Sequence, residues 1–212
     1  MDVPTPEQSK PTARQWVTGV LVAVIGVTWQ YTALWLVERW VQTYPRVTDV
    51  VMDRLPRLNF GIWGELFFFG LLVLILVLFF RRQAWDTPKV LLTLGIFYFV
   101  RGTIQLFLPI GAPLNALPPD QRLNLWGFAS HAYFPGGHIG VLTILTMSLK
   151  NQVIRRWAWV GVLLFGAGTL LAKNHYTADS IVGVLLGYAI FTLIQQWWFK
   201  NKLPAKAQSI RI

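Results

Sequence analysis

The chain has 212 residues, of which 54% are hydrophobic and only 13% are charged. A soluble domain of this length would carry more charge on its surface, so the composition favours an integral membrane protein. The absence of cysteine excludes disulfides and thiolate metal sites. The net charge of +10 is expected to face anionic lipid headgroups, because no aromatic-basic stripe or motif typical of nucleic-acid binding is present.

Six apolar runs follow one another along the chain. A membrane-spanning helix needs about 20 predominantly apolar residues. Before the first run, residues 1–15 are polar and proline-rich and are expected to form a disordered cytoplasmic tail, without the charged-then-apolar order of a cleavable signal peptide. The first run is too long for such a peptide and is expected to remain in the membrane. The six runs cover residues 16–41, 60–80, 90–110, 134–149, 157–172 and 176–199.

These runs predict an all-α integral membrane protein, a bundle of six transmembrane helices. One catalytic membrane domain is expected over residues 16–199, followed by a basic cytoplasmic tail over residues 200–212. Two glycines of the last run, Gly183 and Gly187, are four residues apart. They are expected to let helices pack closely, either within one chain or between two copies in a homo-oligomer.

Lysine and arginine predict the orientation of the bundle, because loops on the cytoplasmic side of a membrane are enriched in these residues. With a cytoplasmic N-terminus, basic clusters at residues 10–14, 81–89, 150–156 and 200–211 all fall on the cytoplasmic side. Both termini are therefore expected in the cytoplasm. The loops at residues 42–59, 111–133 and 173–175 are expected on the opposite side, which is periplasmic, extracellular or lumenal.

Ionisable side chains gather near the outer end of this predicted bundle. Such groups are costly inside spanning segments and usually have a function there. They fall at the outer ends of several helices or in the loop just before the fourth helix, and therefore share one depth. These residues are His131, His138, His175, Glu65, Arg101 and Asp179.

The spacing of two of these residues predicts a pair. His175 and Asp179 are four residues apart, so on a helix they share a face and their side chains can meet. A carboxylate bonded to one imidazole nitrogen fixes the tautomer and leaves the other nitrogen to act as a base or a nucleophile.

A glycine-containing turn precedes the fourth predicted helix at residues 134–138. Glycine lets the backbone approach a ligand closely, and the N-terminus of a helix offers N–H groups and a positive dipole to an anion. His138 would then lie beside a bound phosphate. Arg101 and Lys173 could complete the charge around it.

Each of these features also has a structural explanation when taken alone. A single HxxxD pair is more often a helix cap, and Arg101 and Lys173 near helix ends more often reach toward the membrane interface. Asp49 and Asp53 lie in a predicted loop and are expected to be solvated. A glycine turn ending in His138, combined with HxxxD at the same membrane face, would rarely arise by chance and favours a catalytic site.

At these residues the sequence resembles the type 2 phosphatidic acid phosphatase (PAP2) superfamily and, more narrowly, its sphingomyelin synthase-like branch. In the superfamily, P-S-G-H opens one helix and H-x-x-x-D opens a later one. Here the motifs read PGGH at residues 135–138 and HYTAD at residues 175–179. HYTxD is the form that the second motif takes in the sphingomyelin synthase branch. That branch also has an arginine followed by Leu-Pro, resembled by Arg101 and residues 108–109, and a first-loop motif resembled by residues 45–49.

The resemblance implies a phosphohistidine mechanism that needs no metal and no cofactor. His175 would attack the phosphorus, and Asp179 would orient and stabilise it. His138 would protonate the leaving alcohol and later activate the acceptor. The phosphate oxygens would be bound by Arg101, Lys173 and the backbone N–H groups of Gly136 and Gly137.

The chain also differs from the family pattern. Gly136 stands where the superfamily has the serine of P-S-G-H. Gly168 and Thr169 stand where the phosphatase branch has Ser-Arg, and the K-x6-R-P motif of that branch is absent. Ala132 stands where the sphingomyelin synthase branch has an acidic residue.

The expected function is therefore that of a membrane lipid phosphatase or phosphotransferase, which cleaves a phosphoester of a phospholipid or lipid phosphate at the outer membrane face. The acceptor, water or an alcohol, decides between the two, and a sphingomyelin synthase-like headgroup transferase is one alternative. A lipid transporter or scramblase that breaks no bond is a second. Less favoured are a zinc site on His131, His138, His175 and Asp179, and an inactive interaction protein of the same fold.

Overall fold

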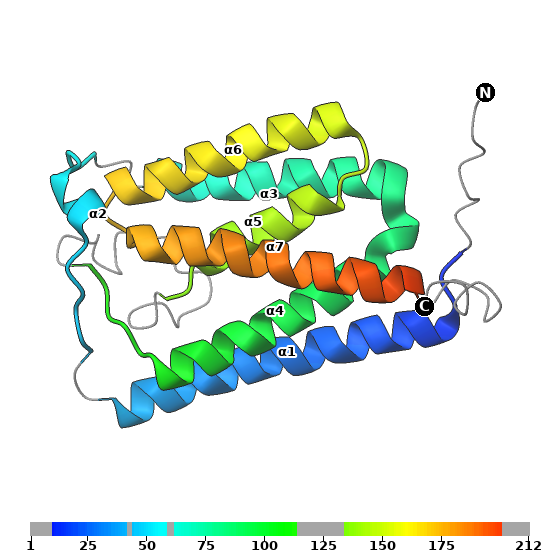
Figure 1. Ribbon diagram of the computed structural model, residues 1–212, viewed down its shortest axis with the longest axis horizontal. Helices are drawn as coiled ribbons and strands as arrows, with labels where there is room; N and C mark the ends of the chain where they lie inside the picture. Colours follow the sequence, from blue (N-terminus) through cyan, green and yellow to red (C-terminus); the bar gives the residue numbers. More distant parts are fainter. Residues whose placement is uncertain (1–9, 42–43, 59–61, 114–133, 201–212) are drawn as a thin grey trace, which may run out of the picture.

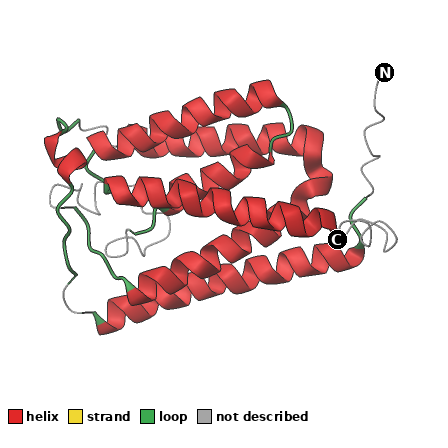
Figure 2. Cartoon of the chain, viewed as in Figure 1, coloured by secondary structure: helices red, strands yellow, loops and turns green. Residues whose placement is uncertain are grey.

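The computed structural model describes residues 10–41, 44–58, 62–113 and 134–200. All regular secondary structure in these ranges is helical (Figure 2). The elements in chain order are α1 (Ala13–Trp40), α2 (Val50–Arg54), α3 (Ile62–Gln83), the short 3₁₀ helix η1 (Ala84–Asp86), α4 (Thr87–Phe107), α5 (Gly137–Ser148), α6 (Gln152–Leu171) and α7 (Thr177–Lys200).

The predicted all-α fold is confirmed, and each of the six apolar runs contains one long helix. The helices differ in length. By length and composition, the stretches apolar and long enough to cross a membrane are Ala13–Trp40, Trp63–Phe107, Gln152–Leu171 and Thr177–Trp197. The second stretch contains both α3 and α4, which have 22 and 21 residues and turn back on each other at η1. Each of these two helices is long enough for a crossing of its own.

Helix α5 departs from the prediction of six full spans. It has only 12 residues, so it rises about 18 Å, well short of a hydrocarbon core about 30 Å thick. It begins at Gly137 because the preceding residues form the glycine turn, and it ends at Ser148 just before the turn into α6.

Local caps define several helix ends. At the start of α1, Thr12 and Gln15 form a capping box, in which each side chain accepts a hydrogen bond from the other residue's backbone N–H. Asn151 caps α6 by accepting from the Ile154 N–H at 3.0 Å. Asp49 caps α2 by accepting from the N–H groups of Val51 and Met52. These side chains satisfy backbone donors that a helix leaves without an internal partner.

The helices form three layers (Figure 1). α1 packs along α4, α3 packs against α6, and α5 and α7 lie between these two pairs. The backbones of α1 and α4 approach so closely that a Cβ at Gly26 would overlap the carbonyl group of Gly95. Near the end of the same interface, a hydrogen bond joins the buried amides of Gln30 and Gln105.

Helices α5 and α7 are also in close contact through glycine. A Cβ at Gly183 would lie 2.5 Å from the carbonyl oxygen of Gly136, and one at Gly187 would lie 2.8 Å from that of Gly140. The predicted small-residue pair therefore packs two helices of one chain. A homo-oligomer stays a prediction.

The two ends of the bundle have different characters. The chain enters α1 and leaves α7 at the same end (Figure 1). At that end Lys150 forms an ion pair with Asp86 at 2.5 Å, and the amine of Lys10 lies 5.5 Å from the ring centre of Trp85. Three of the basic segments that were predicted to share a side, at residues 10–14, 81–89 and 150–156, thus lie at one end, and the fourth lies outside the described residues beyond Lys200. Which side of a membrane this end faces stays a prediction.

Candidate active site

His138 is the second residue of α5, at the end of this helix that points away from the chain ends. Its ring packs edge-on against Phe68 of α3, with ring centres 4.4 Å apart, and lies 6.4 Å from the ring centre of Phe165 of α6. The side chain is nevertheless exposed. The two aromatic rings hold the imidazole in place, and its exposed side leaves it accessible.

His175 and Asp179 form the predicted pair. His175 lies in the turn before α7, and its Nδ1 faces Oδ2 of Asp179 at 3.3 Å. The same carboxylate oxygen accepts a hydrogen bond from the backbone N–H of Tyr176 at 3.1 Å. Asp179 is fully buried, and its other oxygen, Oδ1, has no hydrogen-bond partner among the described residues. The carboxylate therefore closes the first turn of α7 and contacts the histidine with the same atom.

The two histidine motifs meet in space. The ring centres of His138 and His175 are 6.3 Å apart, and their planes are inclined by 82°. The backbone links the motifs as well, because the N–H of Gly136 donates to the carbonyl oxygen of Asp179 at 3.1 Å. A Cβ at Gly136 would lie 2.7 Å from that oxygen, so only glycine allows this approach. The catalytic roles of the two histidines stay predictions.

Arg101 of α4 lies against the glycine turn. Its Nε donates to the carbonyl oxygen of Pro135 at 2.8 Å. A Cβ at Gly137 would lie 2.9 Å from both Cζ and Nε of the guanidinium. Within the described part of the chain the two Nη groups make no hydrogen bond. The Nη groups of the arginine are therefore available as donors beside the N-terminus of α5, where no side chain caps the first N–H groups.

Lys173 is placed differently from the other predicted phosphate ligands. Its side chain is only 4% exposed, and its ammonium group donates to the carbonyl oxygens of Met52 and, at 2.8 Å, of Leu55. These carbonyls belong to the C-terminal end of α2. Lys173 also has a positive φ of 56°, which a non-glycine residue adopts only in a turn that holds it there. In this arrangement the lysine caps α2.

Asp49, the last residue of the segment that resembles the first-loop motif, was expected to be solvated, and this expectation is wrong. It is 9% exposed, and its carboxylate accepts hydrogen bonds from the backbone N–H and the hydroxyl of Thr177, the hydroxyl at 2.9 Å. Burial alone would raise the pKa of this carboxyl, but the N–H groups of Met52, Thr177 and Val51 and the Thr177 hydroxyl together lower it. An aspartate before a short helix is a capping signal, but the partner 128 residues away could not be read from it.

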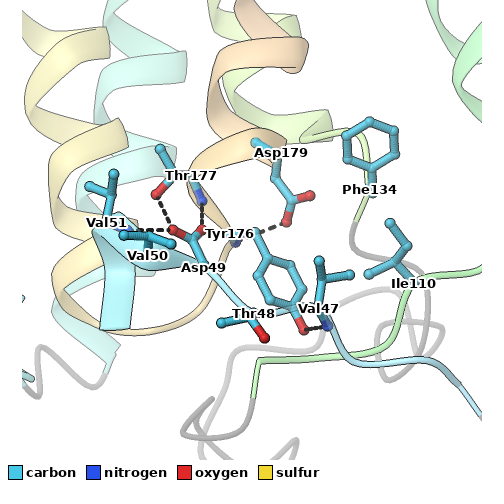
Figure 3. A pocket seen from close by; sticks show the side chains of 11 residues that line it. Val47, Thr48, Asp49, Val50, Val51, Ile110, Phe134, Tyr176, Thr177 and Asp179 are labelled. Atoms are coloured by element: carbon cyan, nitrogen blue, oxygen red, sulfur yellow. Dashed lines mark hydrogen bonds between the residues drawn. The ribbon is translucent and has the colours of Figure 1, made fainter. Parts of the chain in front are cut away.

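A pocket of about 250 Å³ opens beside Asp179 (Figure 3). Five of its lining residues are apolar and bulky, and the polar ones include both Asp49 and Asp179. Neither His138 nor His175 lines it. The lining residues are Val47, Thr48, Asp49, Val50, Val51, Ile110, Phe134, Tyr176, Thr177, Ala178 and Asp179.

Two further ionisable residues were candidates for this site, His131 and Glu65. His131 lies outside the described residues, so its place in a zinc site is not described. Glu65 lies in the first turn of α3 and is partly buried. Among the described residues, no three histidine, aspartate or glutamate side chains are grouped closely enough to hold a metal ion.

Comparisons with known proteins find similarity to one superfamily over part of the chain. The model of the PAP2 superfamily matches residues 115–203, a stretch that contains both histidine motifs but less than half of the chain. An uncharacterized protein of Methanocaldococcus jannaschii is 22% identical over 152 residues, which are 67% of this chain and 64% of that protein. The chain thus spans slightly less than two thirds of that relative.

The fold resembles that of one solved structure. The crystal structure of LpxE from Aquifex aeolicus superimposes with a TM-score of 0.52 at 16% sequence identity, over 63% of this chain and 84% of LpxE. At this identity the likeness shows a common fold. A helical fold shared with LpxE, with two converging histidine motifs in the stretch that matches the PAP2 superfamily model, is therefore what structure and comparisons support together. The narrower sphingomyelin synthase-like branch stays a prediction.

Proposed function

We propose that this chain is a PAP2-type lipid phosphatase embedded in the membrane, and that it hydrolyses a phosphoester of a phospholipid or lipid phosphate. The observation that carries the proposal is the meeting of His138 and His175 at a ring distance of 6.3 Å, beside the uncapped N-terminus of α5. Both histidines lie within the stretch that matches the PAP2 superfamily. A base, a nucleophile and an anion-binding helix end at one place are the parts that phosphoryl transfer needs.

In the proposed first step, Nε2 of His175 attacks the phosphorus and forms a P–N bond while the P–O bond to the lipid alcohol breaks. Asp179 holds the Nδ1–H, which keeps the opposite nitrogen available as the nucleophile and stabilises the positive charge that develops on the ring. His138 donates a proton to the leaving alkoxide. This assignment is supported by the 3.3 Å contact of Asp179 with Nδ1 and by the exposed position of His138.

In the second step, a water molecule breaks the P–N bond. His138, now deprotonated, takes the proton of the attacking water, and inorganic phosphate is released. The guanidinium of Arg101 and the N–H groups of Gly137 and His138 at the start of α5 would bind the phosphate oxygens in both steps. Lys173 is left out of this set, because its ammonium group is bound to the carbonyl oxygens of α2.

A second function, transfer of the phosphoryl-containing group to an alcohol, is favoured by one observation. The pocket of about 250 Å³ beside Asp179 has a mainly apolar lining and would admit an organic group larger than water. An alcohol seated there would compete with water for the phosphohistidine and give a sphingomyelin synthase-like reaction. The products distinguish the two functions.

The test uses purified protein in detergent with EDTA, and a panel of phosphatidic acid, phosphatidylglycerophosphate, prenyl pyrophosphates and headgroup phospholipids. Inorganic phosphate and lipid products are measured together, with and without an added alcohol acceptor. Wild type should turn over at least one of these lipids in EDTA, and His175→Ala should lose at least about 1,000-fold in kcat. Brief reaction with a radiolabelled lipid should give an acid-labile phosphoprotein in wild type only.

The matched control is Gly70→Ala, since a Cβ at this position of α3 meets nothing within 4 Å. It should keep the wild-type rate. Full activity in His175→Ala would remove this residue as the nucleophile. Absence of turnover by wild type on every lipid of the panel would overturn the proposed function.

A further inference from the structure

The segment between α1 and α3 is tied to the turn that carries His175. Residues 47–58, which include α2 and are called here the α2 segment, lie across residues 171–177 (Figure 1). Hydrogen bonds join the two along their whole length. They are Leu58 N–H to Leu171 O at 2.9 Å, Lys173 Nζ to Met52 O and Leu55 O, Val47 N–H to the Tyr176 hydroxyl at 3.4 Å, and both Thr177 donors to Asp49.

Asp49 is the member of this set whose carboxylate bonds to the first residue of α7. One carboxylate oxygen, Oδ2, accepts from the first backbone N–H of α7, that of Thr177. The other, Oδ1, accepts from the Thr177 hydroxyl at 2.9 Å and from the N–H groups of Val51 and Met52 at 3.1 and 2.9 Å. A single buried carboxylate thus caps the N-termini of two helices that are far apart in the sequence (Figure 3).

The position of Thr177 links this cap to the reacting groups. Thr177 lies midway between His175 and Asp179, and the first turn of α7 sets the distance between them. Their contact of 3.3 Å is at the long end of a hydrogen bond, so a shift of a few tenths of an ångström would break it. The N–H of Tyr176, which precedes Thr177, also donates to Asp179. A displaced Thr177 would therefore move both partners of the pair.

We propose that Asp49 is a positioning residue for His175, which holds the first turn of α7 so that Asp179 keeps its contact with Nδ1. In this form the inference rests on the proposed function, since it assigns Asp49 to the same reaction. Asp49 is hydrogen-bonded to Thr177. It acts through Thr177, and its removal should slow the chemical step more than it weakens substrate binding.

Kinetics of three variants test this role. Asp49→Ala should lower kcat by about 10- to 100-fold and change KM by less than about threefold. Asp49→Asn keeps one acceptor oxygen and should recover part of the loss. Thr177→Val removes only the hydroxyl donor at nearly constant volume and should cost about two- to tenfold in kcat. The matched control is Asp53→Asn. This exposed acid of the same short helix accepts from the Asp49 N–H at 3.2 Å and makes no hydrogen bond to α7 among the described residues, and since asparagine keeps an acceptor oxygen, the variant should stay within twofold of wild type.

A second readout does not depend on activity. The chain has only three histidines, so 15N-histidine NMR in detergent can follow His175 after assignment with histidine variants. In Asp49→Ala the Nδ1 and Nε2 shifts of His175 should move toward those of a mixture of tautomers, because the acceptor that fixes Nδ1–H is displaced. Asp53→Asn should leave them unchanged. Thermal melting of each variant in detergent shows the folded fraction, to which kcat is normalised.

The outcomes separate the two proposals. Unchanged His175 shifts in Asp49→Ala, with kcat per folded molecule within twofold of wild type, would overturn the positioning role. Altered shifts in a protein whose wild type turns over no lipid would support the positioning role and overturn the proposed function. If Asp49→Ala does not fold, Thr177→Val and Asp49→Asn decide the question by the same two measurements.

Discussion

Replacement of Gly137 by alanine is the sharpest test of the anion site at the start of α5. Gly137 is the first residue of this helix, so alanine brings no backbone strain and even favours the helix. The new Cβ would lie 2.9 Å from Cζ and Nε of Arg101 and 3.2 Å from Nη2. All three atoms belong to the far end of a long side chain. The protein should therefore fold, with the guanidinium displaced from its place against the turn.

The size of the effect follows from these distances. Comfortable contact between carbon atoms needs about 3.5 Å or more, so the guanidinium must retreat by roughly 0.6 Å. The hydrogen bond from Nε of Arg101 to Pro135 O, now 2.8 Å long, would then leave the normal range. A hydrogen bond to a charged group contributes about 1.5–3 kcal/mol. If the same energy is lost from phosphate binding in the transition state, kcat/KM falls about 10- to 150-fold.

The assay compares kcat/KM of wild type, Gly137→Ala, Arg101→Gln and the double variant on the responding lipid, with Gly70→Ala as the control for an added methyl group. Because the proposed defect of Gly137→Ala is the displaced arginine, the double variant should be no worse than Arg101→Gln alone. The reasoning is refuted if Gly137→Ala keeps activity within twofold of wild type. It is equally refuted if the two losses multiply in the double variant, since the glycine would then act by a route that does not involve Arg101.

Three further predictions concern stability. Gly26→Ala should lower the melting temperature strongly, because its Cβ would overlap backbone atoms of Gly95 that cannot move aside, whereas Gly70→Ala should not. Lys173→Met leaves two carbonyls at the end of α2 without their donor and should cost about 1–3 kcal/mol of unfolding free energy. KM should change less than threefold in this variant, whereas loss of a lysine that binds the phosphate would raise KM more than about tenfold. The pKa of Asp49 is lowered from its ordinary value of 3.8, so its contribution to stability is complete above that pH and is lost as the pH falls through the lower folded pKa. The melting temperature of wild type should therefore fall more steeply between about pH 5 and pH 2 than that of Asp49→Asn, and parallel curves would contradict this.

The helices could be predicted from the sequence because each is an almost uninterrupted apolar run. The run FFFGLLVLILVLFF lies inside α3. In lipid, a helix is the structure that pairs all backbone N–H and C=O groups of a single run within that run. Helix α5 shows where this reasoning fails. Its predicted run began at Phe134, but the helix begins at Gly137, since the backbone of the preceding residues bonds to Arg101 and Asp179 rather than to itself. Apolar character alone does not reveal those partners.

Of the candidate site, too, one part could be predicted from the sequence and another part could not. His138, His175 and Asp179 could be selected because their spacing is local and their types are unusual in apolar helices. Asp49 and Lys173 could not be placed. Their partners lie 128 and 121 residues away, and a polar residue in a loop is solvated unless another segment covers it. Here the α2 segment folds back onto the turn before α7, a contact that no periodicity in either segment predicts.

The short length of α5 explains why the site lies inside the bundle rather than on its rim. The C-terminal end of α5 is held near the chain ends by the adjoining Lys150, which pairs with Asp86. A rise of about 18 Å then brings its N-terminus only partway through a core about 30 Å thick. The neighbouring helices give the same depth. Phe68 contacts His138, Arg101 contacts Pro135 and Phe165 lies near His138, and each of the three is six residues, or about 9 Å, from the site-facing end of its helix.

A recess of this depth has two consequences for the proposed reaction. Beside the buried rings of Phe68 and Phe165, the dipole of α5 and the charge of Arg101 would stabilise a bound phosphoryl group more strongly than in open solvent. The recess also requires that backbone groups at this level find partners within the protein. The bonds of Arg101 to Pro135 and of Gly136 to Asp179 meet this requirement. The polar contacts that fold the glycine turn are thus the same contacts that bring His138 beside His175, and a change that loosens the turn should also disturb the contact between the histidines.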